Sequence, residues 1–205
     1  MGTLRIRAEH PNTVFVITAD HGEGLNVPKH HGIGHGKNLH QSVIALPHVW
    51  MHPSFEGLGR RIPFVTRNID ILPTLLELFD INAHWTMDGE SYAGLLTNAD
   101  AKLALRPAFT ETFFKKETKS SVIYGDWQLI RDRRTKTEEL FKLSDTIAKH
   151  DLIHKERATV ALLRDQLDAW EAEVHRLAEA AGEALEAPMD AETQEMLEVM
   201  GYVED

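Results

Sequence analysis

Histidines gather in the first quarter of this 205-residue sequence, where imidazoles could bind a metal ion or an anion. Eight of the twelve histidines lie there: His10, His21, His30, His31, His35, His40, His48 and His52. Short histidine-rich segments are typical of metal-binding sites, since neutral imidazole is a common metal ligand. The sequence contains no cysteine, which excludes a disulfide, a thiolate metal site or a cysteine nucleophile within it.

Asp20 and His21 directly follow the apolar run TVFVITA, from Thr13 to Ala19, which predicts a strand buried in a parallel sheet. Ligands of open α/β sheets bind just beyond the carboxyl ends of the strands, so a site is expected here. The Asp20 carboxylate suits Ca²⁺, Mg²⁺ or Mn²⁺, and the adjacent imidazole extends the choice towards Mn²⁺ or Zn²⁺. A simple turn is the alternative, because Asp and Gly are common where a strand ends.

A glycine-broken loop follows, in which His30-His31-Gly32 and His35-Gly36-Lys37 bring imidazoles and an ammonium together. Hydrolysis of a sulfate or phosphate ester requires groups that neutralise its peripheral oxygens, and Lys, His and a metal ion are such groups. Glycine lets a loop approach an anion closely. Solvated loop histidines are the alternative, because no spacing here matches the HExxH zinc signature.

The elements that position these residues are expected to alternate between helix and strand as far as residue 105. We expect a helical turn at Asn38–Val43, a strand at Ile44–Met51 and a short helix at Tyr92–Leu96. A longer helix is predicted to begin at Asp70 as its N-cap, with Pro73 in its first turn. One face of that helix is apolar and carries Leu72, Leu75, Leu76 and Phe79.

From Ala108 the pattern changes to short strand-like runs, at residues 109–114, 121–124, 127–132 and 138–143. Gly125-Asp126 forms a two-residue break typical of a hairpin, so an antiparallel meander is predicted. A long helix follows, from about Lys155 to Leu185, with an apolar seam. The seam is short for a coiled coil and favours packing on the sheet of its own domain.

Taken in order, these segments resemble the sulfatase family of the alkaline phosphatase superfamily. The resemblance is carried by TVFVITADHGEG, HGIGHGKNLHQSVIALPHVWMHP, GRRIPFVTRNIDILPTLLELFDI, MDGESYAGLL, VIYGDWQLIRD, EELFKLSDTIAKHDL and EMLEVMGYV. It extends from Asn12 to Val203. It implies an α/β fold: the C-terminal part of a mostly parallel sheet flanked by helices, plus a small antiparallel sheet with a long C-terminal helix. Residues 1–105 would belong to the catalytic domain and 106–205 to the small subdomain.

The resemblance also assigns roles to individual residues. Asp20 and His21 would be metal ligands, with Ca²⁺ as the first expectation and Mn²⁺ or Mg²⁺ as alternatives. Lys37 would pair with the substrate's sulfate oxygens, and His35 is a further candidate for substrate contact. Glu23 would hold the loop by hydrogen bonds.

One part of the family pattern has no counterpart in this sequence. The Cys/Ser-x-Pro-x-Arg motif, whose first residue becomes the formylglycine nucleophile, is absent, and so are the paired aspartates that complete the metal site. We therefore expect a C-terminal portion of a sulfatase that is inactive alone and has the missing N-terminal half as its partner. The strand at Thr13–Ala19 would then expose apolar edges when that half is absent.

The function classes that remain differ in substrate or in chemistry. A metal-dependent hydrolase of sulfate esters, acting on a small molecule or a glycan, is the first hypothesis. A phosphonate or phosphodiester hydrolase, or a phosphoethanolamine transferase, is the second, because His21 stands where many sulfatases have Asn. The third is a non-catalytic remnant that binds a metal or a partner.

Charge and hydropathy exclude two further classes. The formal net charge of -10 argues against nucleic-acid binding, which requires Lys and Arg to displace counterions from phosphates. No run of 18 apolar residues occurs, so no transmembrane segment is predicted.

Overall fold

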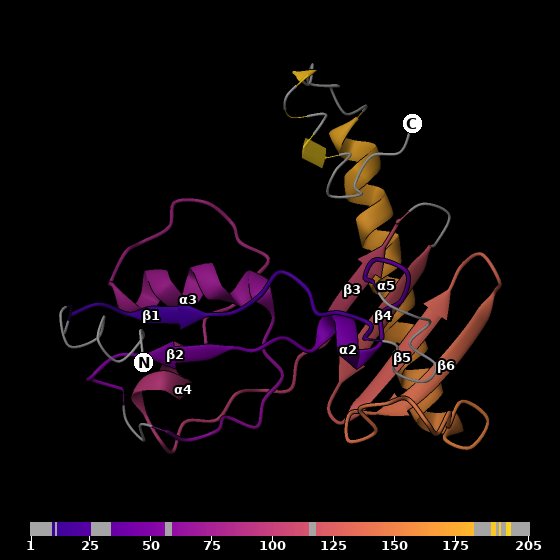
Figure 1. Cartoon of the computed structure of the whole chain (residues 1–205), viewed down its shortest axis with the longest axis horizontal. Helices are drawn as coiled ribbons and strands as arrows, with labels where there is room; N and C mark the ends of the chain where they lie inside the picture. Colours follow the sequence, from indigo (N-terminus) through magenta and orange to yellow (C-terminus); the bar gives the residue numbers. More distant parts are fainter. Residues whose placement is uncertain are drawn as a thin grey trace. The chain divides into compact units, whose positions relative to one another are not determined.

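The computed structural model describes residues 10, 12–25, 34–55, 59–114, 118–182, 190–191, 193 and 196–197. Its elements confirm the predicted α/β fold, with a two-stranded sheet, a four-stranded antiparallel sheet and a long C-terminal helix (Figure 1). In chain order they are β1 Phe15–Ile17, α2 Gln41–Ile44, β2 Val49–Met51, the 3-10 turn η1 Asn68–Asp70, α3 Ile71–Leu78, α4 Ala93–Thr97, β3 Ala108–Thr112, β4 Lys119–Tyr124, β5 Trp127–Asp132, β6 Thr137–Lys142 and α5 Arg157–Ala181.

The chain divides into two compact units, Met1–Asp168 and Ala169–Asp205. The division that we predicted between residues 105 and 106 lies just before β3, inside the first unit. As a statement about domains it stays a prediction. Within the described part of the chain, no helix has the length and apolar character needed to cross a membrane.

The predicted meander is confirmed as the sheet β3-β4-β5-β6, in which each strand is antiparallel to its neighbour. Tyr124 pairs with Trp127 across the predicted two-residue break. Gly125 has a φ of 58° there, a conformation that glycine adopts without the steric cost of a side chain. The hairpin is therefore fixed locally by its own turn residues.

The strand register gives this sheet two faces with different partners. Val122, Leu129 and Leu140 lie side by side on one face and are completely buried. Helix α5 covers this face: Arg131 donates to Asp168 at 2.6 Å and Arg164 to Glu138 at 2.6 Å. The opposite face carries the apolar cluster of Leu39, Ile130, Phe141 and Ala148, in which Leu39 comes from the N-terminal loop. The sheet thus forms a layer between α5 and that loop.

Helix α5 confirms the predicted packing in its first half. Val160, Leu163 and Leu167 are buried, as the apolar seam predicts. Further along the seam, Leu177 is exposed. The predicted end of the helix at Leu185 lies outside the described residues.

The parallel pairing predicted for Thr13–Ala19 is wrong for the part of the sheet described. Strand β1 pairs antiparallel with β2, with Val16 opposite Trp50. Ile17 at the end of β1 is 44% exposed. A continuous apolar run indicates that both faces of a strand are covered, but it carries no information about the direction of the neighbouring strand.

Asp70 begins α3 as predicted, but its carboxylate does not cap the helix. The side chain makes no hydrogen bond to the first turn and is completely buried. It instead accepts hydrogen bonds from the Arg67 guanidinium at 2.7 Å and from the Glu90 backbone N–H at 2.9 Å. The guanidinium of Arg106 lies 3.3 Å away. Asp70 therefore joins three separate segments of the chain.

Burial alone would raise the pKa of Asp70, because desolvation disfavours the charged form. The hydrogen bonds from Arg67 and Glu90 more than offset this, so the pKa of the carboxyl lies below its ordinary value. Asp70 is consequently a buried anion whose charge is balanced by its partners.

Replacing Asp70 by Asn should lower the free energy of unfolding by roughly 3 kcal/mol, because two arginines lose their buried counter-charge. Urea denaturation followed by circular dichroism measures this change. The control is Asp100→Asn at an exposed aspartate, which should shift stability little. Equal stability of the two variants would show that the Asp70 pairs contribute nothing.

A second buried cluster lies between β1, β2, α3 and α4. Phe55, Tyr92, Leu95 and Leu96 form its centre, with Trp50 and Leu78 packed against them. His48 is half-buried beside it, and its ring nitrogens lie 2.8 Å from the Tyr92 hydroxyl and 3.0 Å from the Thr66 hydroxyl. Desolvation lowers the pKa of His48 below 6.5, so the imidazole is neutral in the folded protein at neutral pH.

Stability should therefore decrease as the pH is lowered through 6.5. Below this value the unfolded chain binds a proton at His48 that the folded chain does not, which favours unfolding until the lower folded-state pKa is reached. The free energy of unfolding measured against pH should lose part of this slope in His48→Gln. The variant His52→Gln, at a histidine whose contacts within the described part of the chain are with Ser54 and Phe55, should retain it. An identical slope in His48→Gln and wild type would contradict this account.

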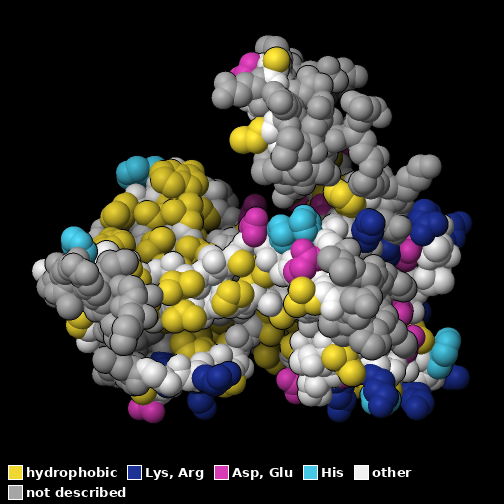
Figure 2. All heavy atoms as spheres, in the orientation of Figure 1, with side chains coloured by type: hydrophobic (Ala, Val, Ile, Leu, Met, Phe, Trp, Pro, Cys, Tyr) yellow, Lys and Arg dark blue, Asp and Glu magenta, His cyan; other side chains and the backbone are white. Residues whose placement is uncertain are grey.

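Large apolar side chains stay exposed over the outer surface of α3 and the adjoining strands. Leu72 and Phe79, two residues of the predicted apolar face, are 49% and 54% exposed. Figure 2 shows hydrophobic side chains gathered over the region that carries α3. Other exposed apolar residues of the same part of the sequence include Ile17, Val49, Val65, Ile69, Ile81 and Trp85. Patches of this kind mark surfaces that bind another protein surface or a ligand.

Candidate metal and anion site

The turn after β1 holds its two predicted metal ligands close together. The His21 backbone N–H donates to one Asp20 carboxylate oxygen at 2.8 Å, and the other oxygen lies 3.7 Å from His21 Nε2. His21 Nδ1 lies 2.8 Å from the Gly22 carbonyl oxygen. Since a carbonyl can only accept, Nδ1 carries the proton and a neutral ring presents an unprotonated Nε2 towards Asp20.

A carboxylate oxygen and an imidazole lone pair that face each other can both ligate one cation. Ligands of one metal ion lie 2.0–2.6 Å from it, which is compatible with a 3.7 Å separation between two of them. Asp20 and His21 therefore fit as two ligands of a divalent cation. The described residues contain no group of three or more His, Asp or Glu side chains that could complete such a site.

His35 joins this turn from the loop that follows. Its ring stacks on the ring of His21, with 3.8 Å between the centroids and 26° between the planes. His35 Nδ1 also lies 3.5 Å from a carboxylate oxygen of Glu23. The structure therefore brings together four of the residues singled out from the sequence, and Glu23 holds the loop as expected of it.

The two carboxyl groups of the turn stay ionised to lower pH than usual. The pKa of Asp20 is lowered chiefly by the backbone N–H of His21, and that of Glu23 chiefly by the backbone N–H of Gly24. Nearby imidazoles add smaller effects in the same direction. Such a pair of anions favours a bound cation over a wide pH range.

Backbone hydrogen bonds fix this turn against α2. The Gly22 N–H donates to the Val43 carbonyl at 2.6 Å, and the Glu23 N–H donates to the Ser42 carbonyl at 3.0 Å. The chains approach so closely that a Cβ on Gly22 would lie 2.2 Å from the Ser42 carbonyl oxygen. Glycine is required at this position because any side chain would push the turn away from α2.

Gly22→Ala should lower the free energy of unfolding by roughly 1–3 kcal/mol, because the added methyl overpacks against backbone. Thermal unfolding measures the loss. Gly94→Ala is the matched control, since a Cβ there meets no atom within 4 Å and alanine favours helix α4 by up to about 1 kcal/mol. A Gly22→Ala protein as stable as Gly94→Ala would show that the close approach is absent in solution.

Lys37 lies on the same loop, two residues after His35, and its side chain is exposed. Within the described part of the chain, no ion pair or hydrogen bond engages its ammonium group. Lys119 Nζ donates to the Lys37 carbonyl at 2.7 Å, so the backbone of Lys37 is held while its ammonium stays available. The predicted contributions of His30 and His31 lie outside the described residues.

Three other histidines of the first quarter, His40, His48 and His52, lie in surroundings of their own. His40 is buried against the four-stranded sheet, 3.6 Å from Glu139. His48 belongs to the cluster around Tyr92, and His52 contacts Ser54. The number of histidines in this part of the sequence therefore exceeds the number that lie at the site. Histidines that are close in sequence have three different surroundings in the structure.

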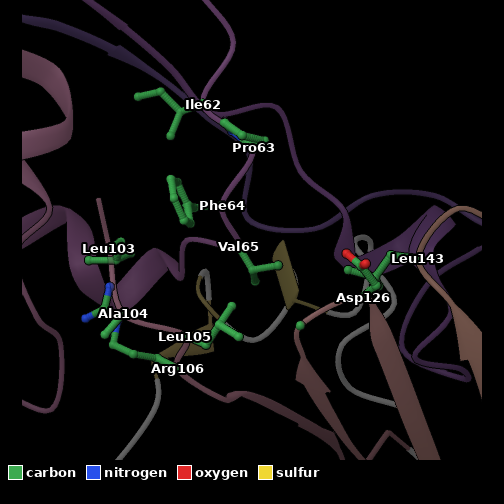
Figure 3. Close-up of a pocket in the computed structure, with 11 residues that line it drawn as sticks. Ile62, Pro63, Phe64, Val65, Leu103, Ala104, Leu105, Arg106, Asp126 and Leu143 are labelled. Atoms are coloured by element: carbon green, nitrogen blue, oxygen red, sulfur yellow. The ribbon is translucent and has the colours of Figure 1, made fainter. Parts of the chain in front are cut away.

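A cavity of about 290 Å³ lies elsewhere, between residues 62–65, residues 103–106 and the turn of β4 and β5 (Figure 3). Apolar side chains such as Phe64 and Leu105 line it, together with Arg106 and Asp126. It includes none of Asp20, His21, His35 or Lys37. The charge and ligand chemistry of the turn, rather than this cavity, indicate the candidate site.

Sequence reasoning missed the residues that hold the loop. Thr112, Lys119 and Gln128 donate to backbone carbonyls of the loop between Gly36 and Leu39. A usable signal was present in the sequence: Gln128 lies in an otherwise apolar part of its strand, where a polar side chain requires a partner.

Comparison with solved structures shows the fold that surrounds this site. A protein from Bacteroides thetaiotaomicron VPI-5482 assigned as a sulfatase superposes with a TM-score of 0.71 and 19% identity, over 90% of this chain and 40% of that one. BT4656, solved with its substrate D-glucosamine-2-N,6-O-disulfate, gives 0.69 and 18%, over 83% of this chain and 36% of its own. The phosphonate monoester hydrolase of Silicibacter pomeroyi gives 0.62 and 20%, over 86% and 37%.

The chain therefore has the fold of part of these sulfatases and of this phosphonate monoester hydrolase. It spans about two fifths of the length of these structures. No protein-family model matches the sequence.

Proposed function

We propose that this chain is the C-terminal portion of a metal-dependent hydrolase of sulfate esters. The observation that carries the proposal is the cluster of Asp20, His21 and His35 at the end of β1, with Lys37 two residues further on the same loop. The fold shared with sulfatases supports it.

The residues of this chain would bind and orient the anionic end of the substrate. The exposed ammonium of Lys37 would pair with peripheral sulfate oxygens, and His35 would add a donor when protonated. Glu23 keeps His35 beside His21, which limits the conformational entropy lost when the anion binds. Charge that develops on the sulfate oxygens would thus meet groups that are already in place.

Asp20 and His21 would supply two ligands to a divalent cation, with Ca²⁺ as the first expectation and Mn²⁺ or Mg²⁺ as alternatives. Such a cation would polarise the sulfate ester. Two ligands hold a hard cation weakly, because Ca²⁺ takes six to eight oxygens. The remaining ligands, and the formylglycine nucleophile, would come from an N-terminal half.

The exposed apolar surface over α3 and β1 supports such a partner. Ile17 on β1 and Leu72 on α3 are each more than two fifths exposed, and so is Phe79, which directly follows α3. Burial of such side chains contributes roughly 25 cal/mol per Å² of apolar surface. An N-terminal half of the same enzyme would cover them and complete the metal site, and this chain alone would be inactive.

A phosphonate monoester or phosphodiester substrate is the second candidate. His21 favours it, and a phosphonate monoester hydrolase is among the similar structures. The complex of BT4656 with a disulfated glucosamine supports a sulfated sugar for the first candidate. The same site residues would serve both, because sulfate and phosphonate share their tetrahedral anionic oxygens.

Lys37→Ala tests the proposal in the enzyme that contains this chain. Turnover of an aryl sulfate should fall by roughly 100-fold or more, since a donor to the developing charge is removed. Lys102→Ala, at an exposed lysine outside the loop, should retain activity. Turnover of an aryl phosphonate monoester by the same preparation separates the two candidate substrates.

Unchanged turnover in Lys37→Ala would exclude Lys37 from the site. Full activity of the 205-residue chain alone would contradict the need for a second half. If the intact protein cleaved neither ester, a non-catalytic role in binding a metal or a partner would replace the enzymatic proposal.

A further inference from the structure

The loop that carries His35 and Lys37 crosses the open face of the four-stranded sheet, and successive strands contact successive loop residues. The Thr112 hydroxyl at the end of β3 donates to the Gly36 carbonyl at 2.6 Å. Lys119 Nζ, at the start of β4, donates to the Lys37 carbonyl at 2.7 Å.

The contacts continue in the same order across the sheet. Gln128 Nε2 on β5 donates to the Leu39 carbonyl at 2.7 Å. Glu139 on β6 lies 3.6 Å from His40 Nε2. Just after β6, the Leu143 carbonyl accepts a hydrogen bond from Gln41 Nε2 at 2.9 Å. Side chains of one sheet therefore contact the loop at successive positions along its backbone.

These donors lie on the same face of the sheet. Thr112 pairs with Lys119 and Lys119 with Asp132 across the ladders, so their side chains project on one side. Gln128, Ile130 and Asp132 are two residues apart along β5, so the Gln128 side chain projects on the same side as that of Asp132. Helix α5 covers the opposite face, so this pattern of polar side chains serves the loop and not the helix.

The individual donors are themselves held in place. Gln128 is 1% exposed and also donates to the Ser121 hydroxyl at 3.0 Å. The ammonium of Lys119 lies 3.7 Å from Asp132. The bond from Gln128 to the Leu39 carbonyl is buried, and a buried carbonyl without a donor costs free energy. The loop also has unusual backbone geometry that such partners hold in place. Gly36, for example, has a φ of 80°, and a Cβ there would lie 2.8 Å from the ring of Phe114.

We infer that Thr112, Lys119 and Gln128 are positioning residues that hold the backbone from Gly36 to Leu39, so that Lys37 is presented beside the turn of Asp20 and His21. This inference deepens the proposed function and takes the role of Lys37 from it. In this account the four-stranded sheet orders the anion-binding loop before substrate binds. The sheet itself does not contact the substrate. Positioning of this kind raises affinity by reducing the entropy lost on binding.

Thr112→Val in the 205-residue chain removes the hydroxyl donor while keeping the shape and the β-strand preference of the side chain. NMR order parameters of the Lys37 and Asn38 amides should fall from about 0.85, typical of rigid backbone, towards about 0.6. The dissociation constant for inorganic sulfate, followed through the Lys37 amide shift, should rise roughly fivefold, as expected for one lost hydrogen bond.

Three variants make the comparison specific. Thr112→Ser restores the hydroxyl and should restore both values. Thr110→Val makes the same substitution on the same face of β3, at a hydroxyl that donates to no loop carbonyl among the described residues, and should leave both values as in wild type. Lys119→Met should loosen the loop at Lys37 in the same way as Thr112→Val.

Unchanged loop order in Thr112→Val, or an equal loss in Thr110→Val, would overturn the inference. A lower melting temperature with unchanged loop order would also overturn it, because that result defines a purely structural role. The variant Lys37→Ala distinguishes failure of this inference about loop positioning from failure of the proposed function. If Lys37→Ala binds sulfate as wild type does, the proposed function fails even where Thr112→Val loosens the loop.

Discussion

The hydrogen bonds between strand side chains and loop carbonyls are the constraint on which the candidate site depends. A loop rich in glycine has no preferred conformation of its own, and its carbonyls require donors where they are buried. Gln128 supplies such a donor to the buried Leu39 carbonyl, and Thr112 and Lys119, on the two neighbouring strands, donate to the more accessible carbonyls of Gly36 and Lys37. The four-stranded sheet, which carries none of the proposed metal ligands or substrate contacts, therefore holds the loop backbone from Gly36 to Leu39.

Buried polar groups join distant segments elsewhere in the chain in the same way. Asp70 connects the start of α3 to Glu90 and Arg106, and His48 connects β2 to Tyr92. Apolar contacts are tolerant of small shifts, whereas a hydrogen bond of a buried group fixes both direction and distance.

Local patterns predicted the elements whose evidence is local. The meander and its Gly125 turn, the short helix near Tyr92 and the buried start of α5 follow from alternation, turn residues and the apolar seam. The direction of β2 relative to β1 could not be predicted, because an apolar run indicates only that a strand is buried. Asp70 was predicted to cap α3 with its side chain, because aspartate is common at N-caps. Aspartate is also common in ion pairs, and the Asp70 carboxylate makes these instead. The loop donors were missed because they lie 76 to 89 residues from the carbonyls they bind.

The central claim is that the loop brings His35 onto the turn of Asp20 and His21 before any substrate or partner binds. The most direct measurement is the set of NOEs between imidazole protons in the isolated 205-residue chain, labelled at histidine. With 3.8 Å between the ring centroids, the account predicts strong NOEs between His21 and His35. Absence of these NOEs, together with a disordered loop by relaxation, would contradict it.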